Sequence, residues 1–298
     1  MPRGRPTILL TGAAGQLGRE LAVALGAHGD VVACDRAALD LADPATIAKV
    51  LRTIRPQLIV NAGAYTAVDR AETEHDAAFA VNGRAPGLLA EEAKRLSAVL
   101  IHYSTDYVFD GERRAPYDET APTAPLNVYG ASKLEGERAI VASGASALIL
   151  RTSWVYARHG HNFLVTMQRL AATRDEVRVV ADQTGVPNWS RALARATATL
   201  VGHGPGYIAE RAGLYHLCAQ GHATWYEFAR AIIGDAAGVR VTPITTQDYP
   251  TPARRPAYAV LDATRFARTF GFALPDWRNL LQDCLRAPVE PPHPSAVH

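Results

Sequence analysis

Short apolar runs alternate with amphipathic segments through the first half of the chain. The runs are short enough to be buried strands, and the segments between them have the apolar periodicity of helices. Strands are predicted at residues 7–10, 31–34, 57–61 and 99–104, and helices at residues 19–25, 44–54 and 76–96. Such alternation predicts an α/β fold whose parallel sheet is covered by helices on both faces.

The regular alternation ends after a further apolar run at residues 147–156, which we expect to be one more buried strand. Beyond it the pattern predicts helices at residues 163–172, 191–201 and 224–233 and a strand at 213–218. A second, smaller region is therefore expected in the C-terminal half. Residues 288–298 contain four prolines and no apolar periodicity, so a disordered tail is expected there.

Composition and charge narrow the range of ligands. The chain has 298 residues, of which 48% are hydrophobic, so it can bury a large core. Its 31 basic and 29 acidic residues leave a formal net charge of only +2. No overall field favours nucleic acid or a membrane surface, and a small ligand is expected.

The cysteines and the N-terminus suggest a cytoplasmic protein. Cys34, Cys218 and Cys284 are odd in number and widely spaced, which predicts neither a disulfide framework nor a zinc site. The first apolar run is too short for a signal peptide or a membrane-spanning helix.

A glycine-rich segment joins the first predicted strand to the first predicted helix. Gly12, Gly15 and Gly18 form a GxxGxxG pattern where a tight turn and close approach to a pyrophosphate need residues without Cβ. The following helix N-terminus offers free amides to phosphates. This pattern alone is weak, since a glycine-rich turn without a ligand has the same appearance. It favours a Rossmann-type, doubly wound parallel sheet.

The end of the second strand bears on the choice of cofactor. Asp35 stands where a carboxylate would hold the ribose hydroxyls of NADH, and Arg36 could pair with the 2′-phosphate of NADPH. Both cofactors stay open. Asp40 could reach the adenine side, although an exposed loop carboxylate is the simpler interpretation. Ala62, Gly63 and Ala64 follow the third strand at the same edge of the sheet.

Tyr129 and Lys133 are four residues apart, so on a helix they share one face. A tyrosine can protonate the oxygen of a ketone that receives hydride, and a nearby ammonium lowers the pKa of that tyrosine. A solvated helix face would show the same spacing. Ser104 or Thr105, at the end of the fourth strand, could orient the carbonyl.

Four longer strings extend these motifs. They are His-Tyr-Ser-Thr-Asp-Tyr-Val-Phe at 102–109, Pro-Leu-Asn-Val-Tyr-Gly at 125–130, Arg-Thr-Ser-Trp-Val-Tyr at 151–156 and Tyr-Pro-Thr-Pro-Ala-Arg-Arg-Pro at 249–256. With them the chain resembles the extended short-chain dehydrogenases/reductases, and more narrowly the dTDP-4-dehydrorhamnose reductase family, over residues 7–285.

The resemblance implies a domain division and a reaction. Residues 1–156 would form the NAD(P)-binding domain, and residues 157–287 mainly the substrate-binding region, with some segments returning to the first domain. The reaction would be reduction of dTDP-6-deoxy-L-lyxo-4-hexulose to dTDP-L-rhamnose by NADPH or NADH.

The resemblance also assigns residues. Thr105, Tyr129 and Lys133 would be catalytic, and Thr105, Asp106, Trp154, Arg254 and Arg255 would contact the sugar nucleotide. The predicted cofactor site comprises Gly12, Gly15, Gln16, Leu17, Gly18, Asp35, Arg36, Asp40, Leu41, Ala62, Gly63, Ala64, Tyr129 and Lys133.

The chain departs from part of this family at Arg191, where some members have a glutamate used in a metal-linked dimer. No metal is predicted for this reason, and Glu20 is expected to belong to the polar face of the first helix. A monomer and a homodimer both stay open. Asn188 is expected to touch the edge of the pocket.

The sequence leaves two rival functions open. Another sugar-nucleotide enzyme of the superfamily, an epimerase or a dehydratase, would recycle its cofactor, but Tyr107 stands where a dehydratase would have a glutamate. A regulatory subunit of methionine adenosyltransferase would bind a dinucleotide without chemistry.

Overall fold

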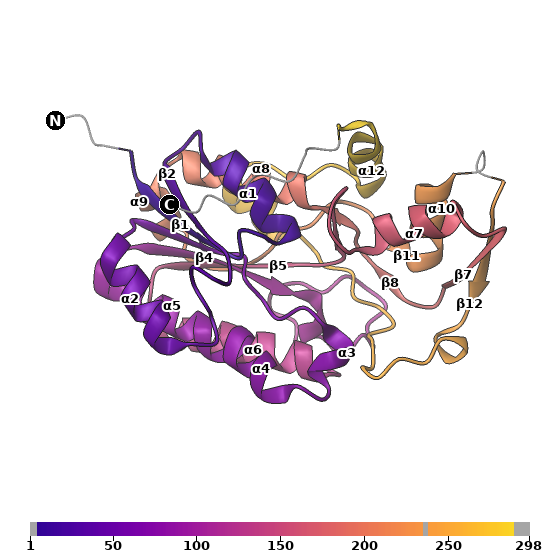
Figure 1. The fold of residues 1–298 in the computed structure, drawn as a ribbon, viewed down its shortest axis with the longest axis horizontal. Coiled ribbons are helices and arrows are strands. Elements are labelled where there is room, and N and C mark those ends of the chain that lie inside the picture. The colour runs from indigo at the N-terminus through magenta and orange to yellow at the C-terminus, as the bar shows by residue number, and fades with distance from the viewer. Residues whose placement is uncertain (1–4, 235–237, 289–298) are drawn as a thin grey trace.

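A computed structural model describes residues 5–234 and 238–288. In this part of the chain one sheet has six strands in the order β10-β5-β4-β3-β1-β2, and all its neighbours are parallel (Figure 1). The order reverses between β1 and β3, which makes their carboxyl ends the topological switch point. The doubly wound α/β prediction is confirmed. The strands are β1 (Thr7–Thr11), β2 (Asp30–Cys34), β3 (Leu58–Asn61), β4 (Val99–Thr105), β5 (Ala147–Thr152) and β10 (Gly213–His216).

Helices cover both faces of this sheet (Figure 1). One face carries α1 (Gln16–Leu25) and α8 (Ser190–Gly202), which pack on each other. The other carries α2 (Pro44–Ile54), α5 (Ala85–Leu96) and α6 (Val128–Ser143). Because β3 and β4 are covered on both sides, all their residues are buried. Each strand begins with an apolar run, residues 58–60 and 99–101, and carries its polar residues toward its carboxyl end.

The helix predicted at residues 76–96 has three parts. It starts as α4 (His75–Phe79), passes through a π-helical turn at Ala80–Arg84 and continues as α5. Backbones meet closely here, because a Cβ on Gly136 of α6 would lie 2.1 Å from the Asn82 carbonyl oxygen. The π turn thus faces the helix that carries Tyr129 and Lys133.

A smaller lobe lies beyond one end of the sheet (Figure 1). It contains α7 (Phe163–Ala171), α10 (Trp225–Ile233) and a parallel pair of strands, β7 (Glu176–Val180) and β12 (Arg240–Ile244), which the apolar pattern did not predict. β10 comes from the C-terminal half of the sequence but belongs to the main sheet. The predicted domain boundaries stay a prediction. The other elements are α3 (Val68–Ala71), α9 (Pro205–Ala209), α11 (Thr264–Phe270), α12 (Trp277–Arg286), β6 (Val155–Tyr156), β8 (Thr184–Gly185), β9 (Asn188–Trp189), β11 (Ala223–Thr224) and short 3-10 turns at Asp106–Val108 and Thr246–Asp248.

The single strand predicted at residues 147–156 is wrong. β5 ends at Thr152, and β6 leaves the sheet to pair with β9. Trp154, between them, has a φ of 43°, a left-handed conformation that is rare for a bulky residue. Its indole stacks on that of Trp225, with ring centroids 3.5 Å apart. This stack accompanies the strained turn, and no local apolar pattern could reveal it.

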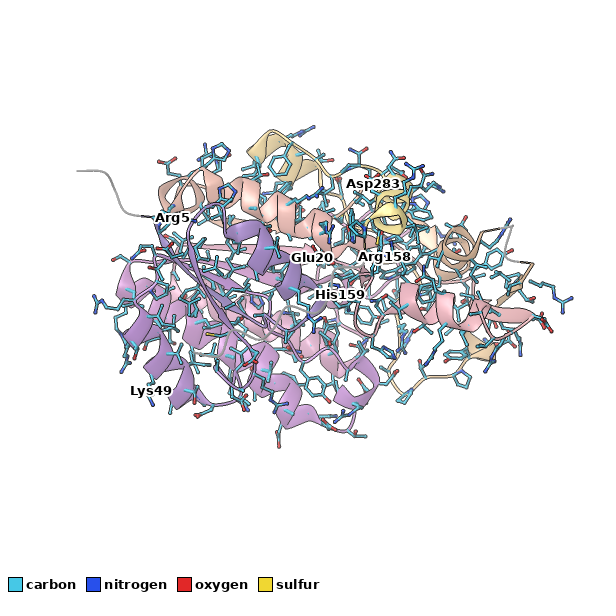
Figure 2. The ribbon with its side chains drawn as sticks, turned by 45° about the horizontal axis from the view of Figure 1, so that its top comes forward. Arg5, Glu20, Lys49, Arg158, His159 and Asp283 are labelled. Carbon is cyan, nitrogen blue, oxygen red and sulfur yellow. The ribbon has the colours of Figure 1, made fainter. Side chains whose placement is uncertain are left out.

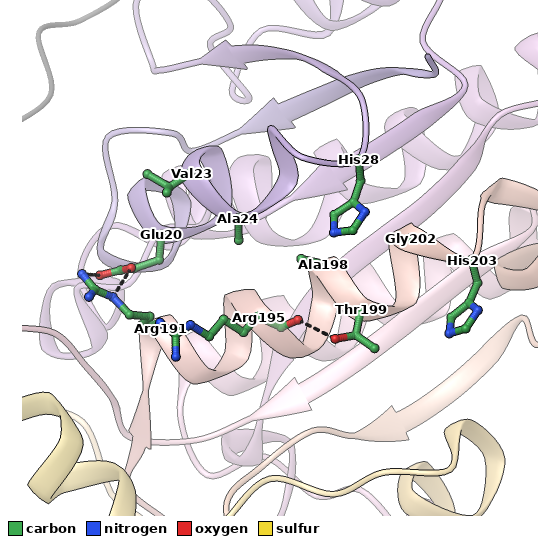
Figure 3. A pocket seen from close by; sticks show the side chains of 10 residues that line it. All are labelled: Glu20, Val23, Ala24, His28, Arg191, Arg195, Ala198, Thr199, Gly202 and His203. Atoms are coloured by element: carbon green, nitrogen blue, oxygen red, sulfur yellow. Dashed lines mark hydrogen bonds and ion pairs between the residues drawn. The ribbon is translucent and has the colours of Figure 1, made fainter. Parts of the chain in front are cut away.

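Glu20 does not belong to an exposed polar face, so that prediction is wrong too. The side chain is buried between α1 and α8, and Arg191 Nε donates to its Oε2 at 2.8 Å (Figure 3). The arginine that departs from the family pattern therefore forms an ion pair with Glu20. The helix period of α1 could not show that α8 covers this side.

Arg158, which lies just after β6, joins that segment of the chain to α12. Its guanidinium donates to the Leu285 carbonyl oxygen at 2.8 Å and to that of Ala287, at the C-terminal end of that helix. Figure 2 labels Arg158, and Asp283 on the helix. The predicted tail at 288–298 lies outside the described residues except for Pro288. No helix in the described part of the chain is long and apolar enough to cross a membrane.

A buried ion pair links α6 to β5. Arg151 Nε donates to Glu137 Oε1 at 2.8 Å and its second guanidinium nitrogen to Oε2 at 2.5 Å. We expect Glu137→Gln to lower the free energy of unfolding by about 3 kcal/mol, because it leaves the buried Arg151 charge uncompensated. Urea denaturation measures this. Glu135→Gln, on the exposed side of the same helix, should change it by less than about 0.5 kcal/mol, and equal effects would contradict the assignment.

Candidate functional site

The glycine-rich loop lies at the switch point of the sheet. Gly12 has a φ of 68°, and a Cβ there would lie 2.5 Å from the Gly63 nitrogen. A Cβ on Gly18 would lie 2.0 Å from the Gly12 carbonyl oxygen. Both positions therefore require glycine, one for its conformation and both for close backbone contact.

The N-terminus of α1 is open toward this loop. Gly15 is the N-cap, no side chain caps the helix, and its first turn holds no acidic residue. Gln16 Oε1 is buried without a hydrogen-bond partner among the described residues, and Leu17 packs on the core. Uncapped amides at a helix N-terminus, reached by a tight glycine turn, fit the diphosphate of a nicotinamide dinucleotide.

The predicted adenosine side is built by the turn after β2. Asp35 Oδ1 accepts hydrogen bonds of 3.0 Å from the Ala37 and Ala38 amides, while the Arg36 side chain is 87% exposed. Asp40 likewise accepts from a backbone amide, that of Ala42, at 2.9 Å.

The segment after β3 completes this edge. Ala62, Gly63 and Ala64 are partly exposed. Leu41 is buried against them, since a Cβ on Gly63 would lie 2.5 Å from Leu41 Cδ1. The predicted residues from β1, β2 and β3 thus lie around one edge of the sheet.

The Tyr129 and Lys133 helix begins at Asn127, whose Oδ1 accepts from the Gly130 amide at 2.8 Å. Lys133 is 2% exposed, and its Nζ donates to the Tyr103 carbonyl oxygen at 2.6 Å. Burial lowers the pKa of Lys133 to about 8, against the opposing charge of Glu137. A solvated lysine face is therefore ruled out for this pair.

Thr105 and Asp106 lie beside the tyrosine. Thr105 Oγ1 donates to Asp106 Oδ1 at 2.9 Å, and Asp106 Oδ2 is buried with no partner among the described residues. Burial raises the pKa of Asp106 to about 7. Burial also raises the pKa of Tyr129 to about 12, and a hydrogen bond with Thr105 opposes that rise. These three groups form one polar cluster against the Tyr107 ring, which meets that of Tyr129 edge-on at 5.6 Å.

Ser104, the alternative to Thr105, points away from this cluster. Its hydroxyl donates to Glu137 Oε1 at 2.5 Å and supports the ion pair beneath the site. Side chains alternate along a strand, so neighbours at a strand end face opposite sides. Of these two residues only Thr105 meets Tyr129, so the alternative prediction that Ser104 orients the carbonyl is wrong.

The two predicted arginines differ in environment. Arg255 donates to Asp69 Oδ2 at 2.9 Å and is partly buried, whereas Arg254 is exposed and has no side-chain partner among the described residues. Asn127 Nδ2 donates to the Arg254 carbonyl oxygen at 2.8 Å. The same side chain thus caps the helix of Tyr129 and holds the arginine loop.

Asn188, expected at the edge of the pocket, is instead fully buried. Its amide donates to the carbonyl oxygens of Ser153 and Val186 at 2.8 and 2.9 Å, and its Oδ1 accepts from the Ala219 amide at 2.7 Å. The side chain thus joins three backbone segments, and the Asn188 backbone amide donates to the Trp154 carbonyl oxygen at 3.1 Å.

An open pocket exists elsewhere, between α1 and α8 (Figure 3). Its lining includes Glu20, Arg191 and Arg195 but none of the predicted cofactor or substrate residues. The candidate site is therefore defined by its polar cluster and glycine loop, and not by this pocket.

Comparison with known proteins agrees with this geometry. Residues 6–289 match the family model described as the RmlD substrate binding domain. The chain belongs to the RmlD family.

Named relatives of this family are similar over almost their whole length. The dTDP-4-dehydrorhamnose reductase of Burkholderia thailandensis is 46% identical over 294 residues, which cover 94% of this chain and 98% of the relative. That of Escherichia coli K12 is 44% identical, covering 91% and 94%. The crystal structure of dTDP-4-dehydrorhamnose reductase from Bacillus anthracis in complex with NADP is 36% identical, with a TM-score of 0.88 and coverage of 94% and 99%. The resemblance stated from the sequence strings is confirmed.

Some residues of this RmlD family site were missed as separate predictions. Asn127 could have been found as a typical N-cap residue directly before a helix. Lys133 has a further signal, because only three of the 31 basic residues are lysines, and a chain that otherwise uses arginine retains one in its core. The contacts of Asn61 and His102 could not be predicted from the sequence, because they join side chains from three strands.

We expect Gly18→Ala to weaken NADPH binding roughly tenfold to a hundredfold, because the new Cβ must displace the loop at a cost of about 1–3 kcal/mol. Fluorescence titration with NADPH measures this. Gly26→Ala, at the other end of α1, is the control, since its Cβ would meet nothing nearer than 3.5 Å. Unchanged affinity in Gly18→Ala would contradict the placement of the diphosphate.

Proposed function

We propose that this protein reduces the C4 ketone of dTDP-6-deoxy-L-lyxo-4-hexulose to give dTDP-L-rhamnose, with NADPH or NADH as the reductant. The observation that carries the proposal is that Thr105 bonds to Tyr129, while Lys133, one helical turn on, is buried and donates to the Tyr103 carbonyl oxygen near the end of the same strand. Membership of the RmlD family, and relatives above 40% identity that are named dTDP-4-dehydrorhamnose reductase, support the same reaction.

The side chains divide the chemistry between them. The reduced nicotinamide supplies the hydride to C4. Tyr129 donates its proton to the carbonyl oxygen, so one hydride and one proton complete the alcohol. Thr105 orients that oxygen, and the Lys133 charge stabilises the tyrosinate left behind.

The substrate contacts are proposed from polar groups that have no side-chain partner among the described residues. Arg254 has no side-chain partner among the described residues, and the paired donors of its guanidinium match diphosphate oxygens. Arg255, which bonds to Asp69, stiffens the same loop. Asp106 and Trp154 are proposed to contact the sugar. Asp106 Oδ2, which has no hydrogen-bond partner among the described residues, accepts a hydrogen bond from a sugar hydroxyl when the carboxyl is ionised.

Arg36 favours NADPH in this proposal. Its guanidinium is exposed, 4.0 Å from Asp40, and able to meet a 2′-phosphate. Asp35 keeps NADH open, because its Oδ2 is not used by the turn. We also propose a cytoplasmic location, where the free cysteines stay reduced, and either a monomer or a homodimer.

An epimerase or dehydratase is less well supported. A dehydratase needs a further acid beside the threonine, and the residue after Asp106 is Tyr107, whose hydroxyl bonds to Arg255. A regulatory dinucleotide-binding subunit has no need of a buried lysine beside a tyrosine. Consumption of NADPH in proportion to dTDP-L-rhamnose formed separates the reductase from both.

We expect Tyr129→Phe to lower kcat by about a thousandfold or more, because the proton donor is lost. The affinity for NADPH should stay within a few-fold, since the ring and the helix remain. Stopped-flow absorbance of NADPH and fluorescence titration measure the two. Tyr107→Phe keeps the neighbouring ring and is the control; turnover near normal in Tyr129→Phe would refute the role.

We expect kcat to fall as the pH rises through about 8. The pKa of Lys133 is lowered to about 8, so the ammonium is present below that pH and lost above it. Ionisation of Asp106, whose pKa is raised to about 7, further raises the pKa of Tyr129. Both changes disfavour tyrosinate. A profile of kcat at saturating NADPH that rises through this range would contradict the assignment.

A further inference from the structure

A chain of buried side chains runs from the glycine loop to Lys133. Thr11 Oγ1 donates to Asn61 Oδ1 at 2.6 Å, and Asn61 Nδ2 lies 2.9 Å from His102 Nδ1. His102 Nε2 in turn lies 3.2 Å from Lys133 Nζ. Asn61 and His102 are both fully buried, and neither has a place in the reaction described above.

The orientation of the Asn61 amide is determined by a backbone group. The Gly63 N–H, which can only donate, lies 3.2 Å from Asn61 Oδ1, so that atom is the oxygen. The opposite atom is the NH2 group, which donates to His102 Nδ1. His102 Nδ1 is therefore an acceptor without a proton.

The tautomer of His102 follows. Burial, and then the charge of Lys133, lower the pKa of His102 well below its usual value, so the ring is neutral. A neutral ring carries one N–H, and with Nδ1 accepting it lies on Nε2, which faces Lys133 Nζ. An ammonium has no lone pair to accept this N–H, whereas a neutral amine has one.

We propose that Asn61 and His102 are positioning residues that hold the neutral amine of Lys133: Asn61 sets the tautomer of His102, and the Nε2–H of His102 donates to Nζ. The amine keeps one N–H on the Tyr103 carbonyl oxygen and has one more for the site. The inference rests on the proposed function of Lys133.

The consequence is a lysine that readily gives up a proton. After Tyr129 protonates the substrate oxygen, the tyrosinate regains a proton from the Lys133 ammonium, and His102 Nε2–H then occupies the lone pair of the amine. Solvent restores the ammonium before the next turnover. The nearby charges of Glu137 and Arg151 are paired with each other. They therefore do not take the place of the hydrogen bond from His102 to Lys133 Nζ.

Nuclear magnetic resonance tests this without any activity assay. The sequence has only three lysines, and Lys49 and Lys94 are both exposed, Lys49 projecting from α2 (Figure 2). In full-length protein labelled at 13Cε of lysine and 15N of histidine, we expect His102 to keep the Nε2–H tautomer across neutral pH. Lys133 should titrate well below the two surface lysines. His102→Gln identifies the His102 signal by its loss.

Two variants separate positioning from mere burial. In Asn61→Asp the carboxylate cannot donate to Nδ1, so His102 should change to the Nδ1–H tautomer and offer Nε2 to the ammonium. The proton affinity of Lys133 should then rise about tenfold or more. His102→Gln adds no charge, and its amide oxygen can turn to the ammonium, so it should raise the Lys133 pKa in the same direction and shift the pH profile of kcat with it.

The control is Thr11→Val, which removes one donor to Asn61 Oδ1 but leaves the Gly63 amide and should keep both the tautomer and the Lys133 pKa. An Nδ1–H tautomer in the unaltered protein, or a Lys133 pKa that stays the same in His102→Gln and Asn61→Asp, would overturn the proposal. Because these spectra need no substrate, they stand apart from the reductase assay, whose failure would instead refute the proposed function.

Discussion

The site depends most on the hydrogen bonds of the Asn61 side chain. This side chain stands at the end of β3 and bonds to Thr11 on β1, to the Gly63 amide and to His102 on β4. These strands end at the same edge because their registers are parallel. Each of these buried groups would cost about 1–3 kcal/mol if left without a partner, so the end of the sheet is held in one arrangement.

Close backbone contacts extend this arrangement to the helices. Gly12 lies against Gly63 at the switch point, and Gly136 of α6 lies against the π-helical turn at Asn82. A methyl group at any of these places would separate the elements. The glycine loop and the helix of Tyr129 are therefore positioned by contacts with the same central strands, and the proposed hydride and proton donors share one rigid frame.

The substrate side is held differently. Asn127 caps α6 and binds the backbone of the loop with Arg254, so this loop is tied to the helix that carries Tyr129. Trp154 adopts a left-handed conformation and stacks on Trp225 of the smaller lobe. Strain of this kind persists only where surrounding contacts outweigh it, and here those contacts come from both halves of the sequence.

The sequence by itself determined the α/β class, most strands of the sheet, the glycine loop and the family, because apolar periodicity and short motifs are local properties. It also singled out Tyr129 and Lys133 through their helical spacing. Tertiary structure alone decided that Glu20 is buried with Arg191, that β5 ends before Trp154 and that Thr105, not Ser104, meets Tyr129. The contacts of Asn61, His102 and Lys133 join residues up to 50 positions apart, and only the packing of strands and helix brings such side chains together.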